Sequence, residues 1–308
     1  MMKNTIYYKQ VRLLLKLLPL INREKDLALK GGTAINLFLR NMPRLSVDID
    51  LTYLPVADRE TSLQGINDAL KRVKKNISKL FSQVLVNDRR LGNTDYLTGL
   101  LVREDGVIVK VEVNTIIRGA VNPPIEISLS EKVSELFEMD VTVQSLSFED
   151  VYSGKICAAL DRQHPRDFYD IKLLLENEGI TDKLRKTFLV YLISNNRPIV
   201  ELLNPNPIDI ATVFNQEFSG LTTENVTIDV LIKSRNDLIE TIHTSLTDDD
   251  INFLLSFKGK NPKWDLLGLE GVEDLPAIEW KLLNLNNINE TKHAQAYNKL
   301  EKFLVTLR

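Results

Sequence analysis

Two aspartates, Asp48 and Asp50, stand one residue apart within the apolar run 47–51. In a strand both carboxylates would lie on one face, because side chains alternate between the two faces. Two like charges held that close need a cation between them, and oxygen ligands combined with substrate phosphates suit Mg²⁺. The pair therefore indicates a magnesium site, although such a pair at a strand edge is more often a solvated face.

A Gly-Gly-Thr turn precedes the aspartates, between an apolar strand at 27–30 and a helical run that follows it. Gly31 and Gly32 allow the backbone to approach a ligand without an intervening Cβ, and the free N–H groups at the start of the helix attract anions. Thr33 adds a hydroxyl donor. The turn alone is in most proteins only the start of a helix, but a turn followed so closely by paired acids predicts a nucleotide site.

Glu112 is the candidate for a third acidic residue. The alternation over 107–114 places Glu112 and Lys110 on the face opposite the valines of the same run. Glu112 could complete the acidic site, or it could be an exposed strand residue paired with Lys110. Arg118, just beyond, is a further candidate for contact with phosphate.

A second group of charges lies around a predicted helix–helix joint at 163–165. Its members are Lys155, Arg162, Arg166, Asp167 and Asp170. Lys155 and Arg162 are two helical turns apart on one face, and Arg166 and Asp170 are one turn apart in the next helix. Ion pairs such as Arg162–Asp167 and Arg166–Asp170 could simply tie the helices together, or the group could contact a bound nucleotide. The pattern leaves both interpretations open.

The elements that must position these residues follow from hydrophobic periodicity. Helices are expected at 7–20, 58–80, 184–193 and 225–245, and strands at 27–30, 47–51, 82–88, 96–103, 107–114 and 141–146. Asp105-Gly106 is typical of a hairpin turn. Strands that end near residue 146 predict an α+β chain, with a mixed-sheet domain over residues 1–130 and a mainly helical domain over 131–308. Trp264 and Trp280 are expected in the core.

Composition excludes several classes of protein. The chain has 308 residues, is 44% hydrophobic and 26% charged, and contains no apolar run long enough for a membrane span, so we expect a cytoplasmic protein with no membrane partner. Its single cysteine, Cys157, excludes an internal disulfide and a cysteine-cluster zinc site, and its apolar neighbours predict a buried helix residue.

Charge is unevenly distributed along the chain. The first hundred residues hold 17 Lys and Arg against 9 Asp and Glu, whereas residues 201–250 hold 2 against 10. The basic region suits a polyanionic substrate. A solvated lysine-rich helix at 58–80 explains much of the same excess.

Together these motifs resemble the AbiEii/AbiGii family of nucleotidyltransferase toxins, which belongs to the superfamily related to DNA polymerase β. The family is the toxin half of type IV abortive-infection and Men-type toxin–antitoxin systems. Four motifs carry the resemblance over about residues 27–175: Gly31-Gly32-Thr33, Asp48-Ile49-Asp50, Lys155 within Lys-x-x-Ala-Ala, and Arg166-Asp167 with Asp170. Serine is common in the family where this chain has Thr33, so the hydroxyl is kept.

The resemblance implies a polymerase-β-like domain that transfers a nucleoside monophosphate from an NTP, with pyrophosphate leaving. In some members the acceptor is the 3′ end of tRNA, and modification of that end stops translation. Asp48, Asp50 and Glu112 would hold Mg²⁺, and Lys155 would neutralise charge on the triphosphate. The implied nucleotide-binding residues are Gly31, Gly32, Thr33, Arg166 and Asp170, with Asp167 as a further catalytic residue.

The resemblance also implies a cognate antitoxin protein as partner. The alternative is a catalytically silent NTP-binding or regulatory module of an antitoxin complex. Asp48, Asp50 and Lys155, the charged residues that the chemistry requires, are all present, which favours an active enzyme.

Overall fold

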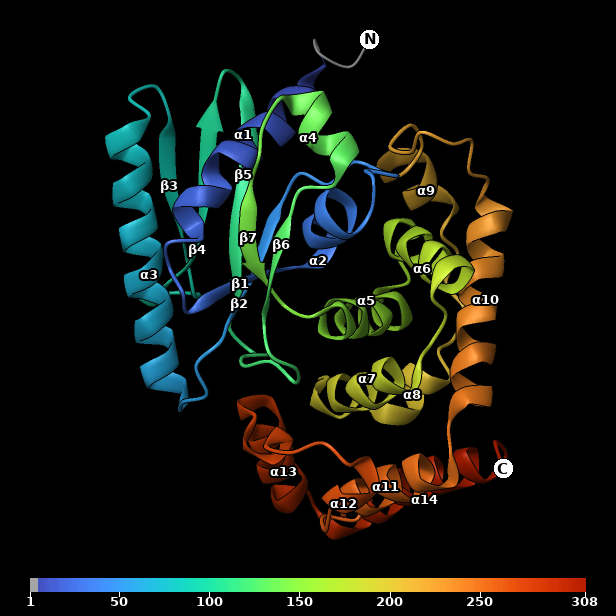
Figure 1. Cartoon of the computed structure of the whole chain (residues 1–308). Coiled ribbons are helices and arrows are strands. Elements are labelled where there is room, and N and C mark those ends of the chain that lie inside the picture. The colour runs from blue at the N-terminus through green and yellow to red at the C-terminus, as the bar shows by residue number, and fades with distance from the viewer. Residues whose placement is uncertain (1–4) are drawn as a thin grey trace. The chain divides into compact units, whose positions relative to one another are not determined.

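The computed structural model describes residues 5–308 and divides the chain into two compact units, Met1–Val151 and Tyr152–Arg308 (Figure 1). Within the described residues, every strand belongs to the first unit, and the second is built from helices. The unit boundary lies later than the boundary at residue 130 expected from the sequence. It does so because the strand Thr142–Ser145 returns to pair with the sheet of the first unit.

The first unit is built on one seven-stranded mixed sheet with the order β3-β4-β5-β2-β1-β7-β6. β2 pairs with β5, and β1 with β7, in parallel, whereas the other neighbours are antiparallel. The strands are β1 (Leu27–Lys30), β2 (Ile49–Tyr53), β3 (Leu85–Arg90), β4 (Leu97–Glu104), β5 (Val107–Asn114), β6 (Ile125–Ser128) and β7 (Thr142–Ser145). The predicted mixed sheet is therefore confirmed. β6 was not predicted.

Helices α1 (Ile6–Ile21) and α3 (Arg59–Leu80) contact each other, and they pack on β5 and β4 respectively. The alternating valines of β5, together with Leu100 and Val102 of β4, are buried, so this face of the sheet forms the core of the first unit. The polar residues of β5 consequently lie on the opposite face. The unpredicted helix α4 (Glu131–Phe137) completes the unit.

Two local predictions around the glycine turn need correction. The helix that follows the turn is α-helical only over α2 (Gly31–Thr33) and continues as a π-helix, η2 (Ala34–Leu39). The Arg40 N–H bonds to the carbonyl of Ile35, five residues earlier, which is the π-helical spacing. Asp48 precedes β2 rather than lying within it.

The second unit is built from helices, the first of which, α5 (Phe148–Arg162), begins four residues before the boundary. In chain order, the helices that follow it are α6 (Pro165–Asn177), α7 (Asp182–Ser194), α8 (Ile199–Leu203), α9 (Ala211–Glu217), α10 (Ile228–Ser245), α11 (Asp248–Lys258), α12 (Trp264–Leu267), the 3₁₀ turn η3 (Val272–Asp274), α13 (Pro276–Asn287) and α14 (Glu290–Val305). No helix formed by residues 5–308 combines the length and the apolar character needed to cross a bilayer.

Single aromatic and cysteine positions test the predicted core. Trp264 packs against the buried rings of Phe253 and Phe257 but is itself only half-buried, at the margin of the core. The prediction for Trp280 was wrong, because its side chain is 58% exposed on α13. Cys157 is buried, as predicted, and its pKa is raised by burial and by the negative charge of Asp161.

A buried carboxylate, Asp150, fastens the start of α5 to the preceding loop. It accepts hydrogen bonds from the backbone N–H groups of Val121 (2.8 Å) and Asn122 (3.0 Å) and from the hydroxyl of Ser147 (2.8 Å). The Ser147 hydroxyl accepts in turn from the Asp150 backbone N–H. One side chain thereby satisfies donors from two segments about thirty residues apart in the chain.

Asp150→Ala should therefore destabilise the protein by about 2–3 kcal/mol, because at least two partly buried backbone donors lose their acceptor. Urea unfolding followed by circular dichroism measures the change. Glu135→Ala, at an exposed carboxylate on α4, is the matched control and should change stability by less than about 0.5 kcal/mol. Equal effects of the two substitutions would contradict the structural role of Asp150.

Candidate active site

One row of residues crosses five adjacent strands of the sheet. The strand register pairs Lys30 with Asp50, Asp50 with Glu112, Glu112 with Gly99, and Gly99 with Arg89. Residues directly opposite one another in a sheet point to the same face, and this is the face away from α1 and α3. The structure thus brings Asp50 and Glu112, predicted from separate sequence motifs, onto neighbouring strands of one row.

Glu112 forms an ion pair with Arg89, which sits two strands away. Arg89 can reach Glu112 because Gly99, which lies between them, has no side chain. A Cβ added to Gly99 would lie 2.4 Å from the carbonyl oxygen of Val111. The partner of Glu112 in the row is therefore Arg89, which sequence reasoning missed, whereas Lys110 was the partner considered from the alternation.

Lys30 closes the other end of the row beside Asp50. Burial lowers the pKa of Lys30, and the negative charge of Asp50 opposes that shift. Sequence reasoning also missed Lys30, although its position directly before the Gly-Gly-Thr turn was a usable signal. The row thus places a cation at each end and two carboxylates between them.

The glycine turn is shaped around Asp50. Gly31 has φ +72°, and a Cβ added there would lie 2.6 Å from Oδ2 of Asp50. A side chain is therefore excluded both by the left-handed backbone and by the carboxylate. The close approach that the sequence predicted for a ligand is occupied here by a carboxylate of the candidate metal pair.

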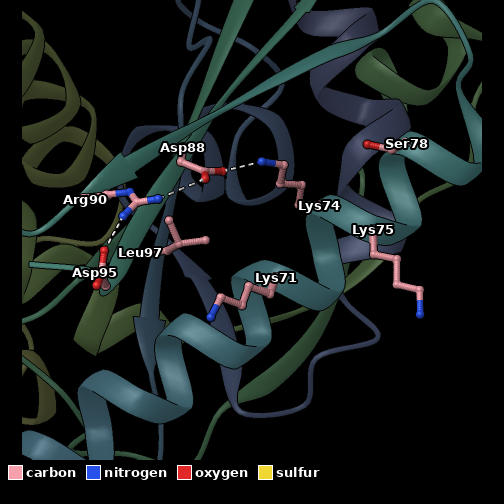
Figure 2. Close-up of a pocket in the computed structure, with 8 residues that line it drawn as sticks. All are labelled: Lys71, Lys74, Lys75, Ser78, Asp88, Arg90, Asp95 and Leu97. Carbon is pink, nitrogen blue, oxygen red and sulfur yellow. Dashed lines mark hydrogen bonds and ion pairs between the residues drawn. The ribbon is translucent and has the colours of Figure 1, made fainter.

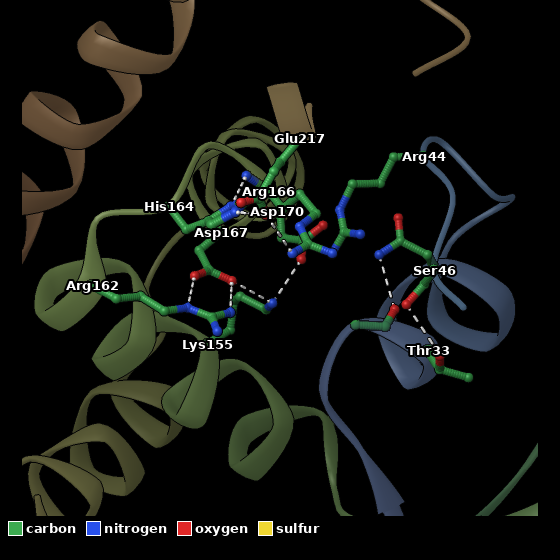
Figure 3. Close-up of polar contacts among 12 residues, drawn as sticks. Thr33, Arg44, Ser46, Lys155, Arg162, His164, Arg166, Asp167, Asp170 and Glu217 are labelled. Atoms are coloured by element: carbon green, nitrogen blue, oxygen red, sulfur yellow. Dashed lines mark hydrogen bonds and ion pairs between the residues drawn. The ribbon is translucent and has the colours of Figure 1, made fainter. Parts of the chain in front are cut away.

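Thr33 contacts the segment that leads into β2 (Figure 3), and Gly32 lies close to the same segment. The buried Thr33 hydroxyl donates to the carbonyl of Asp48 at 2.5 Å and lies 3.1 Å from the Ser46 hydroxyl. A Cβ added to Gly32 would lie 2.9 Å from Ser46 Oγ and 3.1 Å from Nη2 of Arg44. Thr33 thus fixes the backbone at Asp48, while its role toward a nucleotide stays a prediction.

Arg44 and Ser46 are further polar residues of this site that sequence reasoning missed. Ser46 continues the alternation of Asp48 and Asp50 backward by two residues, so the period-2 pattern could have identified it. Arg44 is buried, and its Nη1 donates to the carbonyl of Leu45 at 2.9 Å. The other basic candidate, Arg118, donates to the backbone carbonyl of Asp58 (3.1 Å), where α3 begins.

In the second unit, Lys155 lies between two buried carboxylates of α6 (Figure 3). Its Nζ is 2.8 Å from Asp167 Oδ1 and 3.0 Å from Asp170 Oδ2, and the Lys155 side chain is only 7% exposed. Arg162 adds a bidentate contact, from Nε to Oδ2 of Asp167 at 2.6 Å and from Nη2 to Oδ1 at 3.0 Å. The predicted convergence of charges at the helix joint is therefore confirmed, with Lys155 at its centre.

Opposite charges control the protonation of Asp167. Burial alone would raise its pKa, but Lys155 and the Arg162 hydrogen bond outweigh burial and hold the pKa well below its usual range. The group of Lys155, Arg162, Asp167 and Asp170, called here the charged quartet, therefore joins α5 to α6 around an ionised Asp167.

Arg166 makes a different contact from the one expected. Its Nη2 lies 3.4 Å from Oε2 of Glu217, and Nε2 of His164 lies 3.1 Å from the same oxygen. His164 caps α6 by accepting the Arg166 backbone N–H, and burial lowers its pKa despite the partner Glu217. Arg166 thus links the start of α6 to the end of α9.

Asp48, together with the acidic residues Asp50 and Glu112 of the row, provides hard oxygen ligands of the kind that Mg²⁺ takes. Within residues 5–308, no group of three or more His, Cys, Asp or Glu side chains is arranged to hold a metal ion. Two carboxylates are nevertheless enough for Mg²⁺ when substrate phosphates supply further ligands. The donor set of Asp48 and Asp50 therefore fits a magnesium–nucleotide complex, while Glu112 is engaged by Arg89.

Gly31→Ala tests the cradle around Asp50. We expect it to destabilise the protein by about 2–4 kcal/mol, because a left-handed alanine costs about 1–2 kcal/mol and the clash with Asp50 adds a further 1–2 kcal/mol. Urea unfolding measures this loss. Gly106→Ala is the control, since Gly106 has φ +79° and nothing within 4 Å of an added Cβ. A control variant as unstable as Gly31→Ala would show that the clash is unimportant.

The low pKa of Asp167 makes its contribution to stability dependent on pH. Because the pKa of Asp167 is lower in the folded than in the unfolded chain, its ionised carboxylate stabilises the fold at pH values above the unfolded-state pKa of about 4. This stabilisation is lost as the pH falls below that value. The difference in unfolding midpoint between wild type and Asp167→Asn should therefore be constant above about pH 5 and should narrow below pH 4.

Tryptophan fluorescence suits this measurement, because both tryptophans of the chain, Trp264 and Trp280, lie in the second unit. Glu240→Gln, at an exposed carboxylate on α10, is the control and should give no such narrowing. A difference between wild type and Asp167→Asn that widens toward low pH would contradict the assigned ion pairs.

Comparison with known proteins bears on both groups of residues. The family model described as "Nucleotidyl transferase AbiEii toxin, Type IV TA system" matches residues 12–282, which include the row and the charged quartet. A search of curated proteins found no match. The solved structure of MenT4, a nucleotidyltransferase toxin from Mycobacterium tuberculosis H37Rv, has a similar fold. Its TM-score is 0.60 at 16% identity, over 91% of this chain and 93% of that one. The chain therefore belongs to the AbiEii family of nucleotidyl transferase toxins of type IV toxin–antitoxin systems.

Proposed function

We propose that this toxin transfers a nucleoside monophosphate from an NTP to the 3′ end of tRNA and thereby blocks translation. The observation that carries the proposal is the row in which Asp50 lies against the backbone of Gly31 and beside Glu112. This arrangement puts carboxylates next to a glycine turn at the start of a helix, where phosphates bind well. The basic excess of the first hundred residues supports a polyanionic acceptor.

In the proposed reaction, the 3′-hydroxyl oxygen of the acceptor attacks the α-phosphorus of the NTP. A new P–O bond forms while the bond to the β-phosphate oxygen breaks, and pyrophosphate leaves with that electron pair. The hydroxyl proton passes to a carboxylate, for which Glu112 is the candidate. Mg²⁺ held by Asp48 and Asp50 would supply charge neutralisation on the phosphates.

The residues of the chain itself supply orientation and charge. The N–H groups of the turn at Gly31 and Gly32 would contact phosphate oxygens, and the bound Thr33 hydroxyl keeps the backbone of Asp48 in place. Lys155 supplies positive charge toward the triphosphate in this proposal, and Asp167 and Asp170 orient its ammonium group. Arg166 is the further candidate for a nucleotide contact.

Family membership implies a cognate antitoxin, and we propose that it is a protein and that the toxin acts in phage defence by abortive infection. The alternative function is a silent NTP-binding module within the antitoxin complex. The two differ in turnover, because a silent module would bind NTP without moving its label to any acceptor.

Asp50→Asn should reduce nucleotide transfer at least 10²-fold, because it removes a charged oxygen ligand while keeping the size of the side chain. The measurement incubates the full chain with each α-³²P-labelled NTP, Mg²⁺ and total tRNA, and follows label in the tRNA. Asp105→Asn, in the hairpin turn between β4 and β5, is the matched control and should keep full activity.

Circular dichroism should show that both variants are folded. Undiminished transfer by Asp50→Asn would refute the metal-ligand role. NTP binding by the wild type with no label transferred to any acceptor would favour the silent module.

A further inference from the structure

A groove lies between α3 and the edge of the sheet, on the face opposite the row of acidic residues (Figure 2). Its volume is about 640 Å³. It is lined by Lys71, Lys74, Lys75, Ser78, Asp88, Arg90, Asp95 and Leu97, and is called here the lysine groove. All of these residues belong to the first unit.

The cations of the lysine groove are only partly compensated. Asp88 contacts Lys74 at 2.6 Å and Arg90 at 3.9 Å, and Asp95 contacts Arg90 at 2.6 Å (Figure 2). Lys71 and Lys75 are exposed, and neither has an ion-pair partner among residues 5–308. The four cations against two carboxylates leave a net positive surface.

The two unpaired lysines are aligned along the groove. Lys71 and Lys75 are four residues apart and therefore one turn apart on the same side of α3, while the buried Leu70 and Val73 face the core. Exposed, flexible ammonium groups in a solvated groove suit a chain of phosphates better than a single small anion, which needs converging buried donors. Lysine contacts to a nucleic-acid backbone have this character.

The edge strand β3 connects the lysine groove with the row of residues that contains Asp50 and Glu112. Asp88 and Arg90 point into the groove, whereas Arg89, between them, points to the other face and pairs with Glu112. β3 is three strands from β2, which is about 14 Å at about 4.8 Å per strand. An RNA strand of a few nucleotides can span that distance around the edge of the sheet.

We propose that the lysine groove binds the sugar–phosphate backbone of the acceptor RNA, so that the strand passes the edge at β3 and its 3′ end reaches the row at Asp50. This inference rests on the proposed function, since it assumes an RNA acceptor. It assigns substrate binding to a surface on the other face of the sheet from the reacting groups.

The test measures binding of fluorescein-labelled total tRNA to the full chain by fluorescence anisotropy between 50 and 200 mM salt. The double variant Lys71→Glu/Lys75→Glu should bind at least tenfold more weakly at 100 mM salt. The slope of log affinity against log salt should fall by about 2, because two phosphate contacts are lost. Equilibrium dialysis should show unchanged binding of labelled NTP.

The control is Lys9→Glu/Lys132→Glu, which makes the same change in net charge at exposed lysines outside the groove. It should weaken tRNA binding less than twofold. Equal losses in both double variants, or displacement of the tRNA by poly-L-glutamate at equal charge, would reduce the groove to a general anion surface and overturn its assignment to RNA.

The two proposals fail in different ways. If the wild type binds tRNA and transfers label to it while the groove variant does both equally well, the groove inference falls and the proposed function stands. If the wild type binds no tRNA, the proposed acceptor falls, and the groove inference falls with it.

Discussion

The approach of the Asp50 carboxylate to the backbone of Gly31 is the constraint on which the candidate site depends. Antiparallel pairing of β1 and β2 places Lys30 opposite Asp50, so the next residue of the chain must turn directly beside that carboxylate. Only a residue without a Cβ fits there, and only glycine adopts the required backbone angle at little cost. The glycine at the turn therefore follows from this pairing, which also sets Lys30 beside Asp50 in the row.

Compensation of charge organises both groups of site residues, in different ways. On the sheet, Lys30 and Arg89 flank Asp50 and Glu112 in one row whose members come from separate strands. In the helical unit the charged quartet surrounds Asp167, which is 0% exposed, and only its Arg162 side chain reaches solvent to a large extent. Buried ion pairs contribute little net stability, but loss of one partner leaves an uncompensated charge. Such pairs therefore enforce one arrangement of α5 against α6.

The edge strand β3 gives the sheet two chemically distinct surfaces. Because side chains alternate, Arg89 serves the acidic row while Asp88 and Arg90 serve the lysine groove. The solvated-helix explanation of the basic excess is correct for α3, whose apolar residues are buried and whose lysines are exposed. That explanation is compatible with binding of a polyanion, since the same exposed lysines line the groove.

The sequence by itself determined the elements, because hydrophobic periodicity and turn chemistry are local. It predicted the strands of the sheet apart from β6, the Asp105-Gly106 hairpin, the helix joint near residue 164 and the motifs of the family. Only the tertiary structure decided which residues meet. Arg89 reaches Glu112 across Gly99, and Lys155 rather than Arg166 joins Asp170, since such partners depend on strand order and helix packing. Trp280 was misjudged for the same reason, because an apolar side chain is buried only where another element covers it.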